Sequence, residues 1–381
     1  MEDQTGIDAN MIKEVARLFA KTKKGIIFWG MGVSQHVHGT DNARCLISLA
    51  LMTGNVGRQG SGLHPLRGQN NVQGAADMGC QPHQGAGYFP VADEKHQEFY
   101  TEKYGVTHPT KPGLKIPQMF EAAINKELKG LWIIGEDIVQ TDPNSAHVIE
   151  AMNSLELLVV QEIFMSETAK LATVVLPGTT FLEKDGTFTN TERRIQRVNR
   201  AVPPLPGTKP DGLIVTEMMQ KLGFDQPTYD ADQVLAEIAD IVPFFKGVTR
   251  ERLGKFGLQW PVQEDGTDTK ILHTETFKLG KGRLKNFDWK ESSEIETNQK
   301  DYPLILTTSR VLQHYNAATM TRRTKNINIV DEDVLLIHPK DAAYRDLNTG
   351  DILSLIHISE PTRPERIGGG GGGGKKKEGG G

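Results

Sequence analysis

Leu131-Trp-Ile-Ile134 is a run of four apolar residues that fits a short buried strand, with helical periodicity before it at about 117–128 and after it at about 143–152. The next apolar run is Leu157-Leu-Val-Val160, and a third, Thr173-Val-Val-Leu176, ends at Pro177. Short apolar strands separated by helices are typical of a parallel sheet covered on both faces. The sequence therefore predicts an α/β fold with a doubly wound, Rossmann-like parallel sheet.

The same alternation is expected nearer the N-terminus. A helix capped by Asp8 carries an apolar stripe and ends by Gly25, and Ile26-Ile-Phe-Trp29 fits a buried strand. The stripe consists of Met11, Ile12, Val15, Ala16, Leu18 and Phe19. A further helix from Asp41 to Met52 has Cys45 on its apolar face, which predicts a core thiol. Two more helices are expected between about 211 and 241, whereas residues 245–300 look irregular and polar.

Glycine and polar residues collect where the predicted strands end. In open parallel sheets, ligands bind beyond the carboxyl ends of the strands. Glycine amides can cradle a pyrophosphate, and the carboxylate of Asp137 could accept two protons of a guanine. One such turn is weak evidence, because every α/β domain needs glycine turns, but three at one edge favour a nucleotide-like ligand. The candidate residues are Gly30, Met31, Gly32, Gln35, Asp137, Thr141 and Gln161.

The stretch Arg67-Gly-Gln-Asn-Asn-Val-Gln-Gly74 has no obvious use in a globular core. It combines one arginine with the side-chain amides of Gln69, Asn70, Asn71 and Gln73, and Val72 is its one apolar residue. Such a loop can donate many hydrogen bonds to an anionic or heterocyclic ligand, and its glycines allow a close approach of the backbone. It is the strongest candidate for a functional site.

Two stretches carry a resemblance to a known family. Residues 66–79 and 183–196 are similar to segments of molybdopterin-dependent formate dehydrogenases, within the dimethyl-sulfoxide-reductase superfamily. The resemblance implies that Arg67 pairs with the formate carboxylate, that Gln69 contacts the pterin, and that Arg193 and Arg194 reach phosphates or the pterin; a solvated charged loop is the alternative for these two arginines. It assigns the glycine and polar residues at the strand ends to the arms of molybdopterin guanine dinucleotide.

The resemblance also implies cofactors for which this sequence contains only some of the expected binding residues. The family uses two pterin dinucleotides, molybdenum or tungsten, and a cysteine or selenocysteine ligand, with a 4Fe-4S cluster in an N-terminal part. No CxxC pair or Cys-His pair is present, because the two cysteines are Cys45 and Cys80, so no metal ligand is assigned. The chain is expected to be an internal fragment that is inactive alone. Electron-transfer subunits or domains are the implied partners, and formate the implied substrate.

The C-terminal part is similar to the start of the superfamily's β-barrel. Leu304-Ile-Leu-Thr-Thr-Ser-Arg310, followed by His314-Tyr315, opens this β-rich part, and Arg310, His314 and Asn316 correspond to cofactor-contacting positions, although a lone histidine is usually structural. The expected domains are an α/β region over 1–225, a connecting region over 226–300 and the barrel start over 301–352. Residues 353–381 resemble translated sequencing-adapter DNA followed by a glycine run, with a flexible linker as the alternative.

Composition excludes some functions and leaves others open. A net charge of −4 and a charged fraction of 24% give no sign of a nucleic-acid partner, and no apolar run approaches the roughly 20 residues that span a bilayer. A cytoplasmic location is expected, and Met1-Glu-Asp-Gln-Thr-Gly6 does not resemble a signal peptide. Two other functions remain open: a pterin-dinucleotide-binding module without redox turnover, and a related molybdopterin oxidoreductase with another substrate. A nicotinamide-binding protein is disfavoured, because no complete GxGxxG opens a βαβ unit.

Overall fold

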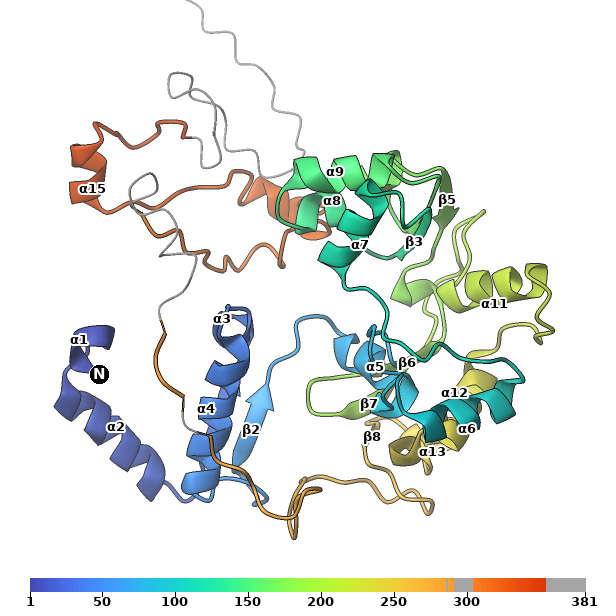
Figure 1. The fold of residues 1–381 in the computed structure, drawn as a ribbon, viewed down its shortest axis with the longest axis horizontal. Helices are drawn as coiled ribbons and strands as arrows, with labels where there is room; N and C mark the ends of the chain where they lie inside the picture. The colour runs from blue at the N-terminus through green and yellow to red at the C-terminus, as the bar shows by residue number, and fades with distance from the viewer. Residues whose placement is uncertain (286, 291–303, 354–381) are drawn as a thin grey trace, which may run out of the picture. The chain divides into compact units, whose positions relative to one another are not determined.

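The computed structural model describes residues 1–285, 287–290 and 304–353, and Figure 1 shows the chain. Its contacts divide the chain into two compact units, each built from segments distant in sequence. Unit 1 contains Met1–Leu114, Thr180–Pro204 and Val215–Leu306, and unit 2 contains Lys115–Thr179, Leu205–Ile214 and Thr307–Gly381. The tail at 354–381 lies outside the described residues, and the domain limits expected from the sequence stay a prediction.

Unit 2 is built on the predicted parallel sheet. Strands β3 (Gly130–Ile134), β4 (Leu157–Glu162) and β5 (Val174–Pro177) pair in that order and in parallel. Helices α7 (Ile116–Ile124), α8 (Ile138–Thr141), α9 (Ser145–Asn153) and α10 (Glu167–Lys170) alternate with the strands. The predicted α/β class and the three predicted strands are therefore confirmed.

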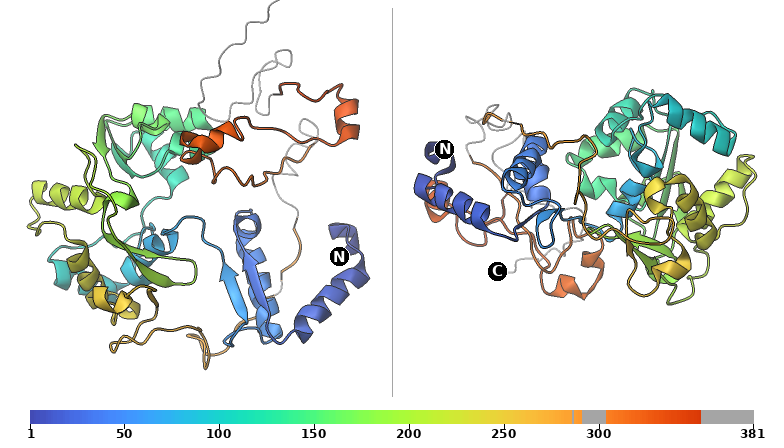
Figure 2. Two further views of the ribbon diagram at one scale, coloured as in Figure 1. Left: turned by 180° about the vertical axis from the view of Figure 1, so that it is seen from behind. Right: turned by 90° about the horizontal axis from the view of Figure 1, so that it is seen from below.

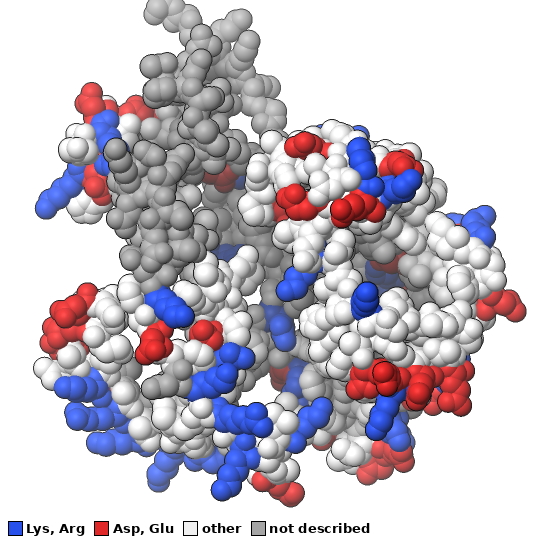
Figure 3. All heavy atoms as spheres, viewed as in Figure 1, with Lys and Arg blue, Asp and Glu red and all other residues white. Residues whose placement is uncertain are grey.

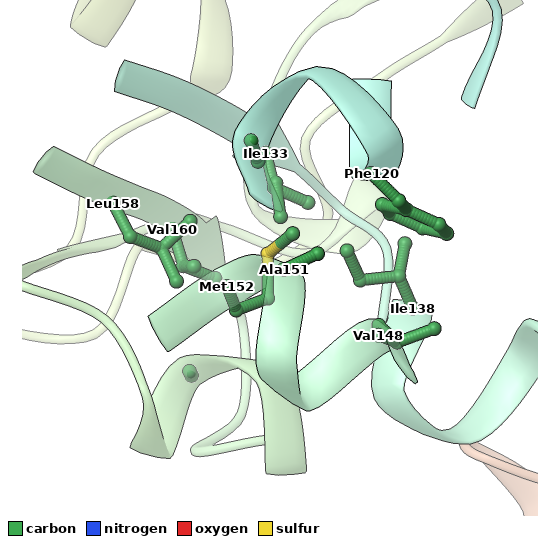
Figure 4. Packing of buried hydrophobic residues seen from close by; sticks show 10 residues of the cluster. Phe120, Ile133, Ile138, Val148, Ala151, Met152, Leu158 and Val160 are labelled. Carbon is green, nitrogen blue, oxygen red and sulfur yellow. The ribbon is translucent and has the colours of Figure 1, made fainter. Parts of the chain in front are cut away.

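The core of unit 2 lies between this sheet and its helices, as Figure 4 shows. Val148 and Ala151 of α9 pack with Leu158 and Val160 of β4, and these four residues are at most 2% exposed. Neighbouring Leu157, the first residue of β4, points to the opposite face and is 45% exposed. Leu158 and Val160 of β4 therefore belong to the buried hydrophobic core of this unit.

Unit 1 contains two smaller sheets. Strand β1 (Ile26–Trp29) pairs in parallel with β2 (Gly62–Pro65), beside helix α4 (Gly39–Met52), and Figure 2 shows these elements from two further sides. Strands β6 (Gly186–Thr189) and β7 (Arg194–Val198) form an antiparallel hairpin that β8 (Leu258–Gln259) extends. The other helices of this unit are α1 (Glu2–Thr5), α2 (Ala9–Lys21), α3 (Met31–Ser34), α5 (Val72–Asp77), η1 (Ala86–Tyr88), α6 (Glu94–Tyr104), η2 (Phe181–Glu183), α12 (Ala231–Ile241), η3 (Pro243–Phe245) and α13 (Arg250–Leu253).

Several burial predictions for unit 1 are wrong. Cys45 is exposed, and in β1 Ile26 and Phe28 are 44% and 57% exposed, because β1 has β2 as its one strand neighbour in this sheet. The predicted helix α2 does start after its Asp8 cap, yet none of its residues is buried. Amphipathic spacing predicts the helix but not what covers its apolar face.

The described residues 245–262 contain α13 and β8, so this part is more regular than its polar sequence indicates. Val248, Leu253 and Val262 are at most 2% exposed and join Ile195 of β7 in the hydrophobic core of unit 1. By contrast, the described residues 304–353 contain η4 (Thr321–Arg323), η5 (Lys325–Asn328) and α15 (Pro339–Tyr344) but no strand. The start of the barrel expected from this part is therefore not seen as strands among these described residues. Helix α11 (Asp211–Lys221) confirms the helix expected after residue 211.

Candidate functional site

The Arg67 loop connects β2 to α5 and is fixed to the β6–β7 hairpin. The backbone N–H of Arg67 donates to Thr191 Oγ1 (3.1 Å), and the Thr191 hydroxyl donates to the carbonyl of Pro65 (2.8 Å). Asn71 Oδ1 accepts the N–H of Thr189 (2.9 Å). The two stretches that carry the family resemblance are therefore in direct contact, and the second holds the backbone of the first.

The guanidinium of Arg67 is held at one nitrogen and open at the others. Its Nε donates to Gln73 Oε1 at 3.0 Å. Within the described ranges no side chain or carbonyl accepts from its terminal nitrogens, and the residue is exposed. Gln69, two residues on, is also exposed. A guanidinium in this state can present its two terminal N–H groups in parallel to one carboxylate.

A buried hydrogen-bond network stands behind Arg67. Asp77 Oδ1 accepts from the Tyr88 hydroxyl (2.6 Å) and from Gln73 Nε2 (2.8 Å), and Asp77 Oδ2 accepts from Trp260 Nε1 (2.9 Å). Gln73 Nε2 also lies 2.9 Å from the Tyr88 oxygen. Asp77 is fully buried and Gln73 is 5% exposed. The network joins the loop, α5, η1 and the segment after β8 into one rigid support.

Burial sets the ionisation of this network. It raises the pKa of Asp77 above the ordinary value, against the three hydrogen bonds and the charge of Arg67, which lower it. Burial and the neighbouring Asp77 also raise the pKa of Tyr88, so its hydroxyl stays protonated and donates. The raised pKa of Asp77 means that its ionisation costs folding free energy, and this cost appears as pH rises through the folded-state pKa.

A glycine next to the network sets its shape. Gly79 has φ +79°, and a Cβ there would lie 2.3 Å from the carbonyl carbon of Gly85, in the backbone that leads into η1. Gly54 has φ +66° but nothing within 4 Å of its Cβ position. We expect Gly79→Ala to destabilise unit 1 by about 2–4 kcal/mol and Gly54→Ala by about 1 kcal/mol, because the second has φ strain alone. Thermal unfolding of both variants tests this prediction. Equal losses of stability in the two variants would contradict a steric clash between the Cβ at position 79 and the backbone of Gly85.

Two of the predicted residues at the sheet edge of unit 2 already have protein partners. Asp137 is buried and accepts from Thr168 N (2.9 Å), Thr168 Oγ1 (2.7 Å) and Gln140 Nε2 (2.6 Å), so it braces the α8–α10 contact. Gln161 Nε2 donates to Asp211 Oδ1 (2.7 Å). Thr141, at the end of α8, is exposed. In this state Asp137 could bind guanine only by exchanging these partners.

Polar atoms without partners gather at the same edge. Gln161 Oε1, at the end of β4, and Thr179 Oγ1, just after β5, are buried and have no hydrogen-bond partner among the described residues. Burial also raises the pKa of Glu162, the next residue of β4. Buried polar groups normally find a partner, so a polar ligand at this edge would satisfy both.

The remaining predicted residues lie in two places. Gly30 is the N-cap residue and Gln35 the C-cap residue of the short helix α3, which contains Met31 and Gly32. The glycine turn expected after β1 is therefore a single helical turn in unit 1. In unit 2, Arg310 Nη1 donates to Asn316 Oδ1 (3.1 Å). His314 is 7% exposed, with Nδ1 3.0 Å from Thr321 Oγ1 and Nε2 2.6 Å from the Val330 carbonyl, and these bonds indicate a structural role.

Arg193 and Arg194 have protein partners rather than open guanidinium groups. Arg193 donates to the carbonyls of Trp260 and Thr269 and lies over the Trp260 ring, and Arg194 pairs with Glu192 at 2.9 Å. Their contacts support the hairpin, and the expected contact of these arginines with phosphates or the pterin stays a prediction. Basic and acidic side chains occur together on the face shown in Figure 3.

The sequence did not reveal the support behind Arg67. Trp260 packs against the core of unit 1, and its indole N–H also donates to Asp77 Oδ2. Gln73 and Asp77 lie in the resembling stretch, and their i, i+4 spacing on a helix is the sequence feature that indicates their contact. Tyr88 had no signal, because its contact with Asp77 depends on the left-handed turn at Gly87 and Tyr88.

Comparison with known proteins decides the family. The family model described as "Molybdopterin oxidoreductase" matches residues 4–221, more than half of the chain. The chain belongs to the molybdopterin oxidoreductase family. A second model, described as "Molydopterin dinucleotide binding domain", matches residues 304–356, so the expected resemblance is confirmed. This match supports the expected start of a dinucleotide-binding domain, although no strand is described there.

Relatives of this family member include formate dehydrogenase subunits. The F420-dependent formate dehydrogenase subunit alpha of Methanocaldococcus jannaschii is 41% identical over 355 residues, which cover 92% of this chain and 52% of the relative. The F420-dependent formate dehydrogenase 2 subunit alpha of Methanococcus maripaludis is 40% identical over 353 residues, which cover 91% and 52%. The chain therefore spans about half the length of these relatives.

A solved structure supports the fold. The acetylene hydratase of Pelobacter acetylenicus matches with a TM-score of 0.60 at 19% identity, and the match covers 92% of this chain and 52% of that chain. At this identity the match shows the fold alone. The part of the chain that the structure describes contains no helix long and apolar enough to cross a bilayer, and no cluster of three His, Cys, Asp or Glu side chains suited to a metal ion.

The residues present fit a molybdopterin cofactor. In unit 2, the unpartnered Gln161 Oε1 and Thr179 Oγ1 can bind the polar edge of a nucleotide base. In unit 1, a Cβ at Gly30 or Gly32 would meet nothing within 4 Å, which leaves the backbone of α3 accessible to a ligand. The exposed amide of Gln69 adds donors beside Arg67. These features agree with the cofactor that the family match implies.

Proposed function

We propose that this chain is the middle part of a formate dehydrogenase catalytic subunit, in which Arg67 binds the carboxylate of formate. The observation that carries the proposal is the state of the Arg67 guanidinium: Nε is bound to Gln73, and the terminal nitrogens are open. Two parallel N–H groups match the two oxygens of formate, so the substrate would be held in one orientation. The relatives named as formate dehydrogenase subunits support this choice of substrate.

The residues of this chain would then bind and orient, and not exchange protons. A guanidinium stays charged at every physiological pH, so it can fix formate with its C–H bond directed away from Arg67. Gln69 would contact the pterin, and Gly30, Met31, Gly32, Gln35, Thr141 and Gln161 the dinucleotide arms. Arg310 and Asn316 would do so in the C-terminal part. When bound, a molybdenum or tungsten centre with two pterin guanine dinucleotides supplies the redox chemistry.

The whole protein is further proposed to contain a 4Fe-4S cluster outside the present sequence and to pass electrons to partner subunits or domains. We also propose that the 381-residue chain alone does not oxidise formate, and that the intact protein acts in the cytoplasm. A module that binds the cofactor without turnover, or an oxidoreductase with another substrate, would share the fold. These alternatives predict no formate-dependent electron transfer.

The test is dye-linked formate oxidation by the intact protein, expressed with the cofactor pathway and purified without oxygen. We expect dye reduction that depends on formate and on molybdate or tungstate in the medium, and none from the 381-residue chain. Cofactor binding without formate-dependent reduction would support the binding module, and reduction with a different substrate would support another oxidoreductase.

A further inference from the structure

The side chain of Arg67 is oriented by a residue that does not touch the substrate site. Gln73 accepts from Arg67 Nε through Oε1, and donates through Nε2 to Asp77. An amide can rotate by half a turn and exchange its oxygen and nitrogen. The rotated Gln73 would direct an NH2 group at Arg67 Nε, and two donors would then face each other. Something must therefore select one of the two amide orientations.

Asp77 makes that selection. Its Oδ1 is acceptor-only when ionised, so it can face the NH2 end of Gln73 and not the carbonyl end. Tyr88 and Trp260 also direct donors at the carboxylate, at 2.6 and 2.9 Å. Asp77 is fully buried, so no water replaces these bonds. Each contact of the chain Asp77–Gln73–Arg67 thus fixes the next.

We propose that Asp77 and Gln73 are positioning residues for Arg67: the buried carboxylate fixes the Gln73 amide so that its oxygen binds Arg67 Nε and leaves the terminal nitrogens for a carboxylate ligand. This inference rests on the proposed function. It predicts that the polarity of Gln73, and not its volume, determines how Arg67 is held. A purely structural network would instead stabilise the fold and leave Arg67 unaffected.

The first readout does not depend on turnover. In the 381-residue chain with ¹⁵N-labelled arginine, the Nε–H resonance of Arg67, assigned with Arg67→Lys, is expected to be sharp and displaced from solvent-exposed arginines. Gln73→Met keeps the length and removes the acceptor, so the resonance should move to the exposed position. Gln97→Met is the matched control, because it removes a bond to the Val91 carbonyl in the same unit. An unchanged Arg67 resonance in Gln73→Met would overturn the proposal.

The second readout is a pH profile in the intact protein. Gln73→Met is expected to lower kcat/KM for formate about 10- to 100-fold, because a misplaced guanidinium no longer aligns the substrate. In Gln73→Glu, the groups in contact with the introduced carboxyl are Asp77, Tyr88 and Arg67. When protonated, this carboxyl could donate to Asp77 and accept from Arg67 Nε, as the amide of Gln73 does. The activity of the variant should therefore recover as pH falls, relative to the wild-type profile.

The outcomes of these experiments distinguish the proposed binding of formate by Arg67 from the proposed positioning of Arg67 by Gln73 and Asp77. If Arg67→Met leaves formate kinetics unchanged, the proposed function fails. If Arg67→Met impairs turnover but Gln73→Met and Asp77→Asn leave both the Arg67 resonance and kcat/KM unchanged, the positioning role fails and the function stands. A Gln73→Glu profile that is parallel to wild type at every pH would also contradict the selection of amide orientation by Asp77.

Discussion

Replacement of Arg67 by methionine in the intact protein is expected to lower kcat/KM for formate by about 100- to 10,000-fold. Two charge-assisted hydrogen bonds would be lost, each contributing about 1.5–3 kcal/mol, and about 1.4 kcal/mol corresponds to a factor of ten. The exposed position of Arg67 means that the fold should tolerate the change. Steady-state kinetics at saturating dye measure the effect.

Two further variants make this result specific. Arg67→Lys keeps the charge but not the planar pair of donors, so it should recover only part of the lost kcat/KM. Arg44→Met is the matched control, because Arg44 is a half-exposed arginine of α4 that pairs with Asp41. Its kinetics should equal wild type. Full activity in Arg67→Lys would show that charge alone suffices and would contradict bidentate binding.

Truncation of Leu158 to alanine is expected to have the largest effect on stability. Leu158 is 2% exposed in the core of unit 2, and such a truncation costs about 2–5 kcal/mol through lost burial and a cavity. Hydrogen exchange of the β3, β4 and β5 amides should accelerate correspondingly, because these strands open together. Mass spectrometry of exchanged fragments measures this in the unit concerned.

Leu157→Ala is the control for this stability prediction. Leu157 is the preceding residue of the same strand, has the same chemistry, and is 45% exposed. Its truncation should change the free energy of unfolding by less than about 1 kcal/mol. Equal acceleration of exchange in both variants would mean that the burial of Leu158 does not determine the stability of β4.

Sequence patterns predicted the elements well where local information suffices. The three strands of unit 2 and their intervening helices follow from short apolar runs and helical spacing, and the Asp8 cap fixes where α2 begins. The predicted burial of β1 and of Cys45 was wrong, because burial depends on what packs against an element. The periodicity of apolar residues predicts which face of a helix or strand is apolar, but not which element packs against that face.

In the candidate site, too, the local features could be predicted from the sequence and the contacts between distant segments could not. Arg67 and Gln69 stand out in the sequence because a loop with so many donors has no use in a core. The support from Asp77, Tyr88 and Trp260 joins positions separated by as many as 183 residues, which no local pattern encodes. His314 is a predicted cofactor contact, but both of its ring nitrogens lie within hydrogen-bond distance of groups in this chain. These bonds favour a structural role for His314. For contacts between segments that are distant in the sequence, the three-dimensional structure identified the partner residues and the sequence spacing did not.

The most direct test is a crystal structure of the intact, cofactor-loaded protein with formate bound. The account predicts both formate oxygens about 2.7–3.0 Å from terminal nitrogens of Arg67, with Arg67 Nε still bound to Gln73. Formate bound elsewhere, with the Arg67 guanidinium directed into bulk solvent, would contradict it.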